Sequence, residues 1–361
     1  MQKLIFFTPG PSQLYPTVEH HINNAFVEDI LSISHRSESF HEIYKSAIDN
    51  IRHLLGVPQD FSIFFLSSAT EAMERIIQNT VEVKSFHFVN GSFSKKFYDI
   101  GLNLKKNAIS NNIELGEWCD IKKIQISPKT ELIALTQNET STGVSIPINE
   151  IEYLAKRYPK MLIAVDIVSS VPYVNLPFNL LDCVFFSVQK GFGMPSGLGI
   201  LIISPRAYEK SVFLNKKGLS TGSYHSFASL SKQNRIFQTP ETPNVLSIYL
   251  LDKISKDMLN TGIQQIRKNT EEKSNLLYDF FEKQENLSLF VKNAKLRSKT
   301  TIVISTPYGS KSIIESIKTK GFILGSGYGS MKEKQIRIAN FPAHQKTDFT
   351  MLLNHLLHLS N

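Results

Sequence analysis

Short apolar runs alternate with amphipathic segments over the first two thirds of the chain. The runs are apolar almost throughout, which is typical of strands buried on both faces of a sheet. They cover residues 61–66, 85–90, 131–136, 161–166, 183–188 and 198–203. Segments with a helical period lie between them, at 67–80, 93–106 and 148–159. This alternation predicts an α/β fold with a mainly parallel sheet covered by helices on both faces.

A further amphipathic helix precedes the first of these runs. Ser39 and Glu42 have the spacing of a capping box, in which each side chain bonds the other residue's backbone amide. The apolar positions that follow keep a helical period up to Gly56. We therefore expect a helix that begins at Ser39.

The pattern changes past residue 240. Two long amphipathic helices are predicted at 242–259 and 262–283. Shorter strands and helices follow, at 300–306, 311–319, 334–340 and 347–358. A chain of 361 residues is long enough for about two domains. We expect a large domain over 16–255 and a smaller α+β domain over 256–361, which also takes in residues 1–15.

The composition is that of a soluble globular protein, with 42% hydrophobic and 20% charged residues. The net charge is +8, but the lysines are scattered in doublets such as Lys95-Lys96 and Lys216-Lys217. This spread fits a basic surface that prefers anionic small molecules, and we expect no binding to nucleic acid. No window has the ~18 consecutive apolar residues of a membrane helix, so we expect no membrane association.

The chain has two cysteines, Cys119 and Cys183, which are too few for a disulfide framework or a metal-ligand spacing. The N-terminus is too rich in proline, and its apolar stretch too short, for a signal peptide. These features predict a cytoplasmic protein without a bound metal.

Lys190 lies between two apolar runs, in a glycine-rich turn that leaves it uncrowded. By itself this stretch fits a surface lysine in a hairpin turn. It also fits a covalent nucleophile, because a partly desolvated ammonium loses its proton more readily and can form a Schiff base.

Other unusual polar and aromatic residues follow the ends of the predicted strands, where ligands of parallel sheets bind. Each alone has another explanation: Asp166 as a helix cap, Phe93 as a core residue, and Ser68 and Thr70 as caps. Together with Lys190 they supply the contacts that pyridoxal 5'-phosphate requires. The set is Ser68, Ala69, Thr70, Phe93, Thr140, Asp166, Gln189 and Lys190.

The requirements of this cofactor are specific. Its aldehyde needs a lysine, and its ring nitrogen needs a buried carboxylate such as Asp166 to stay protonated. Phe93 can stack on the ring, and Thr140 can contact the ring hydroxyl. The phosphate needs a helix N-terminus with free amides, predicted at Ala69 and Thr70, and side-chain donors such as Gln189.

An ordered set of segments is similar to the class V (fold type I) aminotransferases, and within them to those that act on phosphoserine. The segments are FTPGPSQLYP (7–16), SISHRSESF (32–40), NGSFSKKF (90–97), TQNETSTGV (136–144), AVDIVSS (164–170), SVQKGFGMPSGLGILI (187–202), FQTPETPNV (237–245) and QIRIANF (335–341). This resemblance implies a large domain with a mainly parallel seven-stranded sheet and a small C-terminal domain.

The resemblance also implies a role for each matching residue. Lys190 corresponds to the Schiff-base lysine that also moves the proton, and Asp166 to the partner of the ring nitrogen. Phe93 stands where the family usually has a tryptophan. Gln238 and Thr239 correspond to residues that reach the cofactor phosphate from a neighbouring subunit, which implies a homodimer with shared active sites. Gly191, Gly193 and Gly197 are expected to leave room for the cofactor and the partner.

The prediction of the substrate depends on three further residues. Arg337 resembles the arginine that binds the substrate α-carboxylate through two parallel hydrogen bonds. His35 and Arg36 resemble the pair that binds the phosphate of phosphoserine. These residues imply transfer of the amino group of O-phospho-L-serine to 2-oxoglutarate, in serine biosynthesis, by a ping-pong mechanism.

Alternatives stay open on the sequence. The segment Ser67–Ala72 lacks the arginine that phosphoserine aminotransferases often carry there and has Glu71 nearby, which favours a serine– or alanine–glyoxylate or –pyruvate aminotransferase. A cysteine desulfurase is disfavoured, because neither cysteine lies in the C-terminal domain. A basic binding protein that keeps the fold without turnover is the non-enzymatic alternative.

Overall fold

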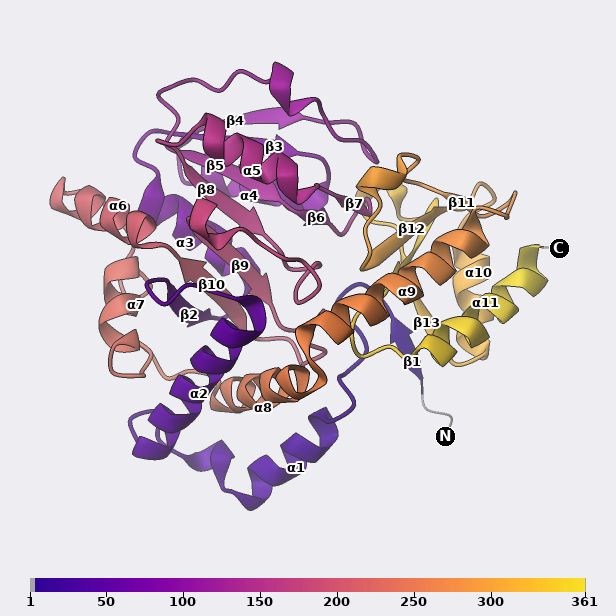
Figure 1. The fold of residues 1–361 in the computed structure, drawn as a ribbon, viewed down its shortest axis with the longest axis horizontal. Helices are drawn as coiled ribbons and strands as arrows, with labels where there is room; N and C mark the ends of the chain where they lie inside the picture. Colours follow the sequence, from indigo (N-terminus) through magenta and orange to yellow (C-terminus); the bar gives the residue numbers. More distant parts are fainter. Residues whose placement is uncertain (1–3, 361) are drawn as a thin grey trace.

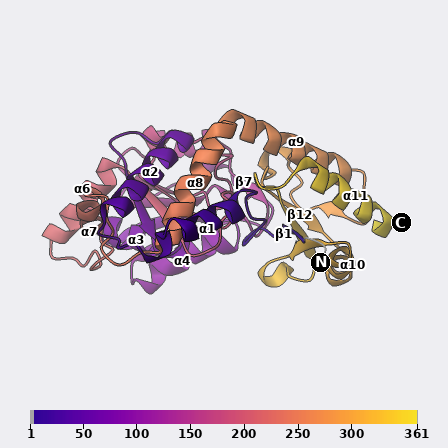
Figure 2. The same cartoon turned by 90° about the horizontal axis from the view of Figure 1, so that it is seen from below.

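Two β-sheets lie side by side along the long axis of the molecule in the computed structural model, which describes residues 4–360 (Figure 1). The larger, seven-stranded sheet is built from the first two thirds of the chain. A five-stranded sheet at the other end carries both termini (Figures 1 and 2).

The seven-stranded sheet is parallel except for one strand. Its order is β2-β10-β9-β8-β5-β3-β4, and β10 is antiparallel to both neighbours. The strands are β2 Ser62–Leu66, β3 Lys84–Val89, β4 Asn107–Asn112, β5 Leu132–Thr136, β8 Leu162–Asp166, β9 Cys183–Ser187 and β10 Gly199–Ile203. The predicted mainly parallel sheet is confirmed.

Helices cover both faces of this sheet, which is why its strands are apolar at nearly every position. Ile63 and Phe65 pack in the core under α2, α5 and α8, whereas Phe64 and Leu66 pack under α3, α4, α6 and α7. The first group is α2 Glu38–Leu55, α5 Ile148–Arg157 and α8 Val245–Thr261. The second is α3 Ala69–Thr80, α4 Ser92–Asn103, α6 Pro205–Lys216 and α7 Phe227–Asn234.

The smaller sheet brings the start of the chain to its end, because β1 pairs in parallel with β13. Its order is β1-β13-β14-β12-β11. The strands are β1 Ile5–Phe7, β11 Ser288–Leu289, β12 Thr301–Ser305, β13 Phe322–Ser326 and β14 Gln335–Ala339. Its core includes apolar residues of α9 Ile263–Phe281, α10 Lys311–Thr319 and α11 Lys346–Ser360.

The two long helices meet at Gly262. Buried residues of α8 up to Met258, and Ile266 of α9, belong to the core of the large sheet, whereas Leu277 and Phe281 of α9 belong to that of the small one. We retain the two-domain division as a proposal, and these cores favour a boundary on α9, after Ile266, rather than at residue 255.

The start of α2 differs from the prediction. Ser37, not Ser39, is the N-cap, and its hydroxyl accepts a hydrogen bond from the backbone N–H of Phe40. The predicted capping box of Ser39 and Glu42 is therefore wrong, because the helix begins two residues earlier than expected. The pattern also missed α1 Val18–Val27, which packs beside α8 through Val18 and Ala25.

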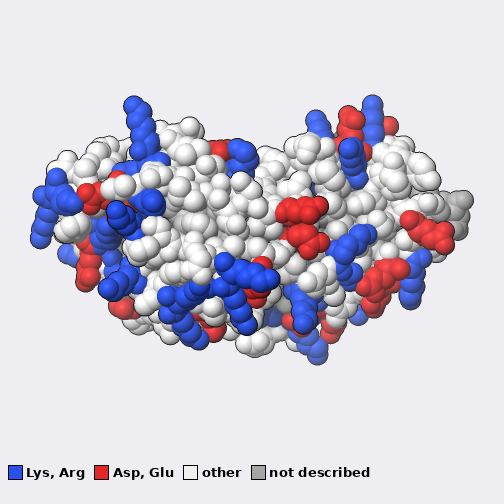
Figure 3. Space-filling view, turned by 90° about the horizontal axis from the view of Figure 1, so that it is seen from above, with Lys and Arg blue, Asp and Glu red and all other residues white. Residues whose placement is uncertain are grey.

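The surface carries both charge signs. On the face drawn in Figure 3, Lys and Arg side chains are spread along the molecule with acidic side chains between them. Within residues 4–360, no helix combines the length and the apolar character that a membrane span requires.

Candidate active site

A cavity lies where the carboxyl ends of the parallel strands meet at one edge of the large sheet. All predicted site residues except His35, Arg36, Gln238 and Thr239 line it. Its walls are Pro9, Gly10, Ser68, Ala69, Thr70, Met73, Phe93, Lys96, Thr140, Asp166, Val168, Ser187, Gln189, Lys190, Tyr328 and Arg337. Both sheets contribute, because Pro9, Gly10 and Arg337 come from segments on or beside the smaller one.

Lys190 follows β9 and points into this cavity. Its side chain is only 5% exposed, and its Nζ donates a hydrogen bond to the hydroxyl of Thr140 at 2.8 Å. Nζ also lies 5.0 Å from the centre of the Phe93 ring. Burial lowers the pKa of Lys190, and the Arg337 charge acts in the same direction, while Asp166 opposes it. The amine is thus more readily deprotonated than an exposed lysine.

Asp166 is the last residue of β8 and is 3% exposed. One carboxylate oxygen accepts the backbone N–H of Val168 at 2.8 Å. Burial raises the pKa of Asp166, whereas the Val168 N–H and the Lys190 charge lower it. A cationic ring nitrogen beside this carboxyl would favour its ionised form and be stabilised in return.

Glu139 is a buried acid that the sequence analysis did not select. It belongs to the short ribbon of β6 Asn138–Glu139 and β7 Val144–Ser145, next to Thr140. Its carboxylate accepts the backbone N–H groups of Phe93 and Ser94, at 3.1 and 2.9 Å, and thereby caps α4. The hydroxyls of Ser94 and Ser141 also donate to it. Glu139 therefore holds the Phe93 backbone in place.

Two more residues shape the cavity beside Phe93. The Tyr328 ring lies 5.3 Å from the Phe93 ring, measured between ring centres. Lys96, one turn along α4, places its Nζ 6.0 Å from the same ring centre. Neither was predicted; the only sequence signal was the position of Lys96 in the motif NGSFSKKF.

Arg337 reaches the cavity from β14. Its Nε donates to the Ser326 carbonyl at 2.7 Å and its Nη1 to the Thr140 carbonyl at 3.2 Å. Burial lowers the pKa of Arg337 to about 10, so the guanidinium remains charged at neutral pH. The two carbonyls fix its orientation in the same cavity as Lys190.

The N-terminus of α3 and the residues before it, Ser67–Thr70, form the turn that we expect to bind the cofactor phosphate, called the anion-binding turn below. Ser68 is the N-cap, and its hydroxyl accepts the Glu71 N–H at 3.1 Å. The Ala69 N–H, predicted to be free, donates instead to the Ser187 hydroxyl at 2.8 Å. The Thr70 N–H donates to no group among residues 4–360. This free amide at the positive end of a helix, beside the Ser68 hydroxyl, fits a phosphate.

Gly10 closes the cavity over Lys190. A Cβ atom on Gly10 would lie 2.7 Å from Lys190 Cε. The glycines after Lys190 act differently from the prediction. A Cβ on Gly191 would meet the Val171 carbonyl, and one on Gly193 would meet the backbone of Tyr15. These two glycines admit the protein's own backbone rather than the cofactor.

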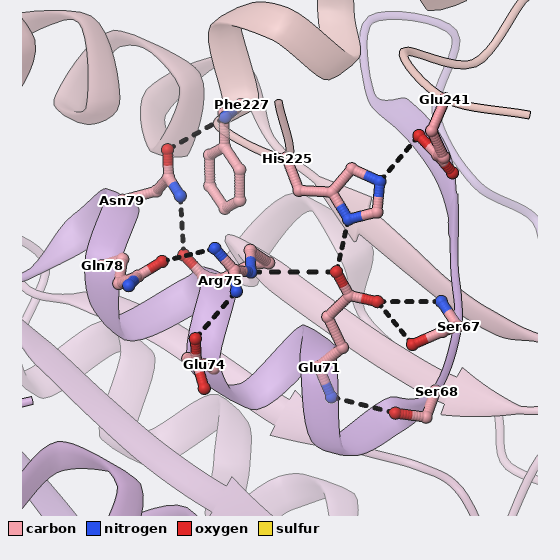
Figure 4. Close-up of polar contacts among 10 residues, drawn as sticks. All are labelled: Ser67, Ser68, Glu71, Glu74, Arg75, Gln78, Asn79, His225, Phe227 and Glu241. Atoms are coloured by element: carbon pink, nitrogen blue, oxygen red, sulfur yellow. Dashed lines mark hydrogen bonds and ion pairs between the residues drawn. The ribbon is translucent and has the colours of Figure 1, made fainter. Parts of the chain in front are cut away.

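Glu71 points away from the cavity. One oxygen of its carboxylate accepts the backbone N–H and the hydroxyl of Ser67, at 2.9 and 2.7 Å (Figure 4). The other lies against His225, which also contacts Glu241. The expected conflict between Glu71 and an anion in the cavity is thus reduced, because the acid is paired.

The four remaining predicted residues form a separate group. The Arg36 guanidinium donates to the Gln238 side-chain oxygen, and the Gln238 amide nitrogen lies 2.9 Å from His41 Nε2. Thr239 is buried and donates to the Glu241 carbonyl. His35 packs edge-on against Phe40. Within one chain these residues do not line the cavity that holds Lys190.

The Aminotransferase class-V family model matches residues 96–336 of this chain. The chain belongs to this family. The crystal structure of a phosphoserine aminotransferase from Cytophaga hutchinsonii is similar to this aminotransferase, with a TM-score of 0.97 and 47% identity over 99% of both chains. A phosphoserine aminotransferase of Corynebacterium glutamicum is 27% identical, covering 96% of this chain and 92% of that protein. Alanine–glyoxylate aminotransferase from Nostoc shares the fold at 21% identity, with a TM-score of 0.82 over 100% of this chain and 96% of that one.

As a class V aminotransferase, the protein is a transaminase that depends on pyridoxal phosphate. Three groups of this cofactor have a matching residue in the cavity. The free Thr70 amide fits the phosphate, the buried Asp166 fits the ring nitrogen, and the buried Lys190 fits the aldehyde. When bound, it supplies an electron sink that stabilises negative charge at the substrate α-carbon. The residues that would hold it are Ser68, Thr70, Phe93, Thr140, Asp166, Gln189 and Lys190.

Proposed function

We propose that this aminotransferase transfers the amino group of O-phospho-L-serine to 2-oxoglutarate, as a homodimer in the cytoplasm. The main support for this substrate is the 47% identity, over 99% of both chains, with a phosphoserine aminotransferase. The buried Arg337 in the Lys190 cavity supports an amino acid substrate, because a guanidinium binds a carboxylate through two hydrogen bonds.

Each residue of the cavity has a separate role in the proposed reaction. Arg337 binds the α-carboxylate and orients the substrate against the Phe93 side of the cavity. Lys190 Nζ takes the α-proton and later returns one, and its lowered pKa suits both steps. Asp166 would stabilise the protonated form of the ring nitrogen of the bound cofactor. Gly10 lines the cavity beside Lys190, and Tyr328 lines it beside Phe93.

The residues that lie outside the cavity support the proposed homodimer. Gln238, Thr239, His35 and Arg36 gather in a second group of the same chain. In a dimer, this group would complete the partner's site, where His35 and Arg36 bind the substrate phosphate and Thr239 the cofactor phosphate. The free thiols of Cys119 and Cys183 suit a reducing cytoplasm.

A substrate panel tests this proposal. The purified enzyme is assayed with phosphoserine, serine and alanine as donors, and with 2-oxoglutarate, glyoxylate and pyruvate as acceptors. The expected result is a kcat/KM for phosphoserine with 2-oxoglutarate that exceeds every other pair by about a hundredfold or more, as two lost charged hydrogen bonds would give. Good rates with serine or alanine and none with phosphoserine would contradict it.

One observation favours the second candidate, a serine– or alanine–glyoxylate or –pyruvate aminotransferase. The turn Ser67–Ala72 at the cavity holds no basic residue. The Arg36→Gln variant separates the two: it should lower kcat/KM for phosphoserine while leaving serine unaffected. A binding protein without turnover would show no reaction with any pair. Wild type should also show an absorbance band at the edge of the visible range, due to a lysine-bound cofactor, and Lys190→Ala should abolish it.

A further inference from the structure

His225 lies in a buried ion cluster beside the anion-binding turn. It precedes α7 and is 3% exposed. Its Nδ1 contacts a Glu71 carboxylate oxygen, and its Nε2 lies 2.8 Å from a Glu241 carboxylate oxygen (Figure 4). Since an ionised carboxylate only accepts hydrogen bonds, both ring nitrogens must donate. The ring is therefore an imidazolium.

Glu71 connects this cation to the turn that faces the cavity. Its other oxygen holds the backbone N–H and the hydroxyl of Ser67. Its own N–H donates to the Ser68 hydroxyl, and both Ser68 and Thr70 line the cavity. The shape of the anion-binding turn thus depends on where the Glu71 carboxylate lies.

The charge of Glu71 is a cost for any phosphate at this turn. Like charges at the same helix end repel, and the repulsion grows where water is excluded. The turn has no basic residue of its own between 67 and 72. His225 supplies a cation from a position 154 residues further along the chain. Arg75 adds a weaker one, with its Nε 3.8 Å from Glu71.

We propose that His225 is a positioning residue for the cofactor phosphate. His225 pairs with Glu71, and this pairing lets the turn Ser67–Thr70 bind a dianion. This inference rests on the proposed function only in its choice of pyridoxal phosphate as the ligand. His225 touches neither cofactor nor substrate, and it acts through Glu71. Through Glu241 it also holds the segment that carries Gln238 and Thr239.

The test compares two cofactors that differ only in the phosphate. Apoenzyme is titrated with pyridoxal 5'-phosphate and with pyridoxal, and binding is followed by absorbance. His225→Gln should weaken binding of pyridoxal 5'-phosphate by roughly ten- to hundredfold, as expected for loss of a charged hydrogen bond. Binding of pyridoxal should change less than about twofold, since the phosphate site is then unused. A general structural role would weaken both cofactors equally and would overturn the proposal.

A double variant and a control sharpen the result. Glu71→Gln with His225→Gln removes both charges and should recover most of the affinity for pyridoxal 5'-phosphate. His87→Gln is the matched control, because His87 is also buried but contacts Ser85 instead of an acid. It should not change the ratio of the two affinities, and a change as large as that of His225→Gln would overturn the proposal.

Glu71→Gln alone keeps the test decisive if His225→Gln does not fold. It removes the negative charge and leaves an oxygen that can accept the Ser67 N–H. Affinity for pyridoxal 5'-phosphate should match or exceed that of wild type, and a selective loss would overturn the proposal. Wild-type enzyme that binds neither cofactor would instead refute the proposed function, so the two failures are distinguishable.

Discussion

Lys190 donates a hydrogen bond to the Thr140 hydroxyl at 2.8 Å, inside a cavity that neither residue could form alone. Thr140 comes from the loop after β6, and Lys190 from the turn after β9. The contact joins Lys190, the residue proposed to move the proton, to the segment that carries Glu139. The Thr140 carbonyl in this segment also accepts a hydrogen bond from Arg337. The active site is therefore a network rather than a set of separate contacts.

Replacing Thr140 with valine should slow transamination while keeping the fold. Valine has nearly the same shape but cannot accept the Lys190 hydrogen bond. A hydrogen bond to a charged group contributes about 1.5–3 kcal/mol, so kcat/KM should fall by roughly ten- to hundredfold. Thr140→Ser retains the hydroxyl and serves as the control. Equal rates for the valine variant and wild type in steady-state assays would contradict this role.

Replacing Arg337 with lysine should act mainly on KM for the amino acid. A lysine keeps the charge but cannot form two parallel hydrogen bonds to a carboxylate. We expect KM to rise by about ten- to hundredfold with a smaller change in kcat. Arg157→Lys on α5, which does not line the cavity, should leave KM unchanged. A drop in kcat alone would speak against carboxylate binding.

Replacing Glu139 with glutamine should displace Phe93. The backbone N–H groups of Phe93, Ser94 and Ser141 donate to the Glu139 carboxylate. In the variant, the glutamine NH2 group replaces one of the accepting oxygens and is itself a donor, so some of these hydrogen bonds are lost. We expect the unfolding free energy to fall by about 1–3 kcal/mol and the visible circular dichroism of the bound cofactor to change. Gly91→Ala should act alike, because its Cβ would clash with the Glu139 side chain. An unchanged dichroism spectrum in both variants would contradict this.

Stability should depend on pH through His225. Burial would lower its pKa, but the hydrogen bonds to Glu241 and Glu71 raise it to about 9. The raised pKa means that this contribution is complete below about pH 6.5, the ordinary histidine value, and is lost as pH rises towards 9. The charged groups that face it are Glu71 and Arg75 of α3 and Glu241. Chemical unfolding at pH 6, 7.5 and 9 should show falling stability in wild type and a flatter profile in His225→Gln.

Replacing Gly10 with alanine should impair cofactor loading. The new Cβ would lie 2.7 Å from Lys190 Cε, and the Gly10 φ of +128° disfavours any side chain. We expect slower and incomplete growth of the cofactor absorbance band when apoenzyme is reconstituted. Gly56→Ala is the control, since Gly56 also has a positive φ but nothing within 4 Å of its Cβ position. Equal reconstitution of the two variants would refute the role of Gly10.

Much of the fold and the cavity could be predicted because both follow from local patterns. Strands buried on both faces are apolar throughout, and their carboxyl ends must share one edge, so Asp166, Thr140 and Lys190 were expected to meet. Strand β4 was missed because it is an edge strand with polar residues, as NAISNN shows. Residues whose partner is distant in sequence gave no signal. His225, Glu139 and Tyr328 owe their positions to tertiary contacts.

The position of β1 in the small sheet sets an order in which the parts of the fold can form during synthesis. β1 precedes the other described strands in the sequence, yet it pairs with β13, which lies about 300 residues further along the chain and is therefore synthesised much later. Pro9 and Gly10, just after β1, form part of the cavity wall over Lys190. While the ribosome is still translating the region before residue 322, β1 has no partner and this wall is not anchored. The strands of the large sheet are therefore all synthesised before β13, whereas the cavity wall over Lys190 is anchored only after residues 322–326 have been made.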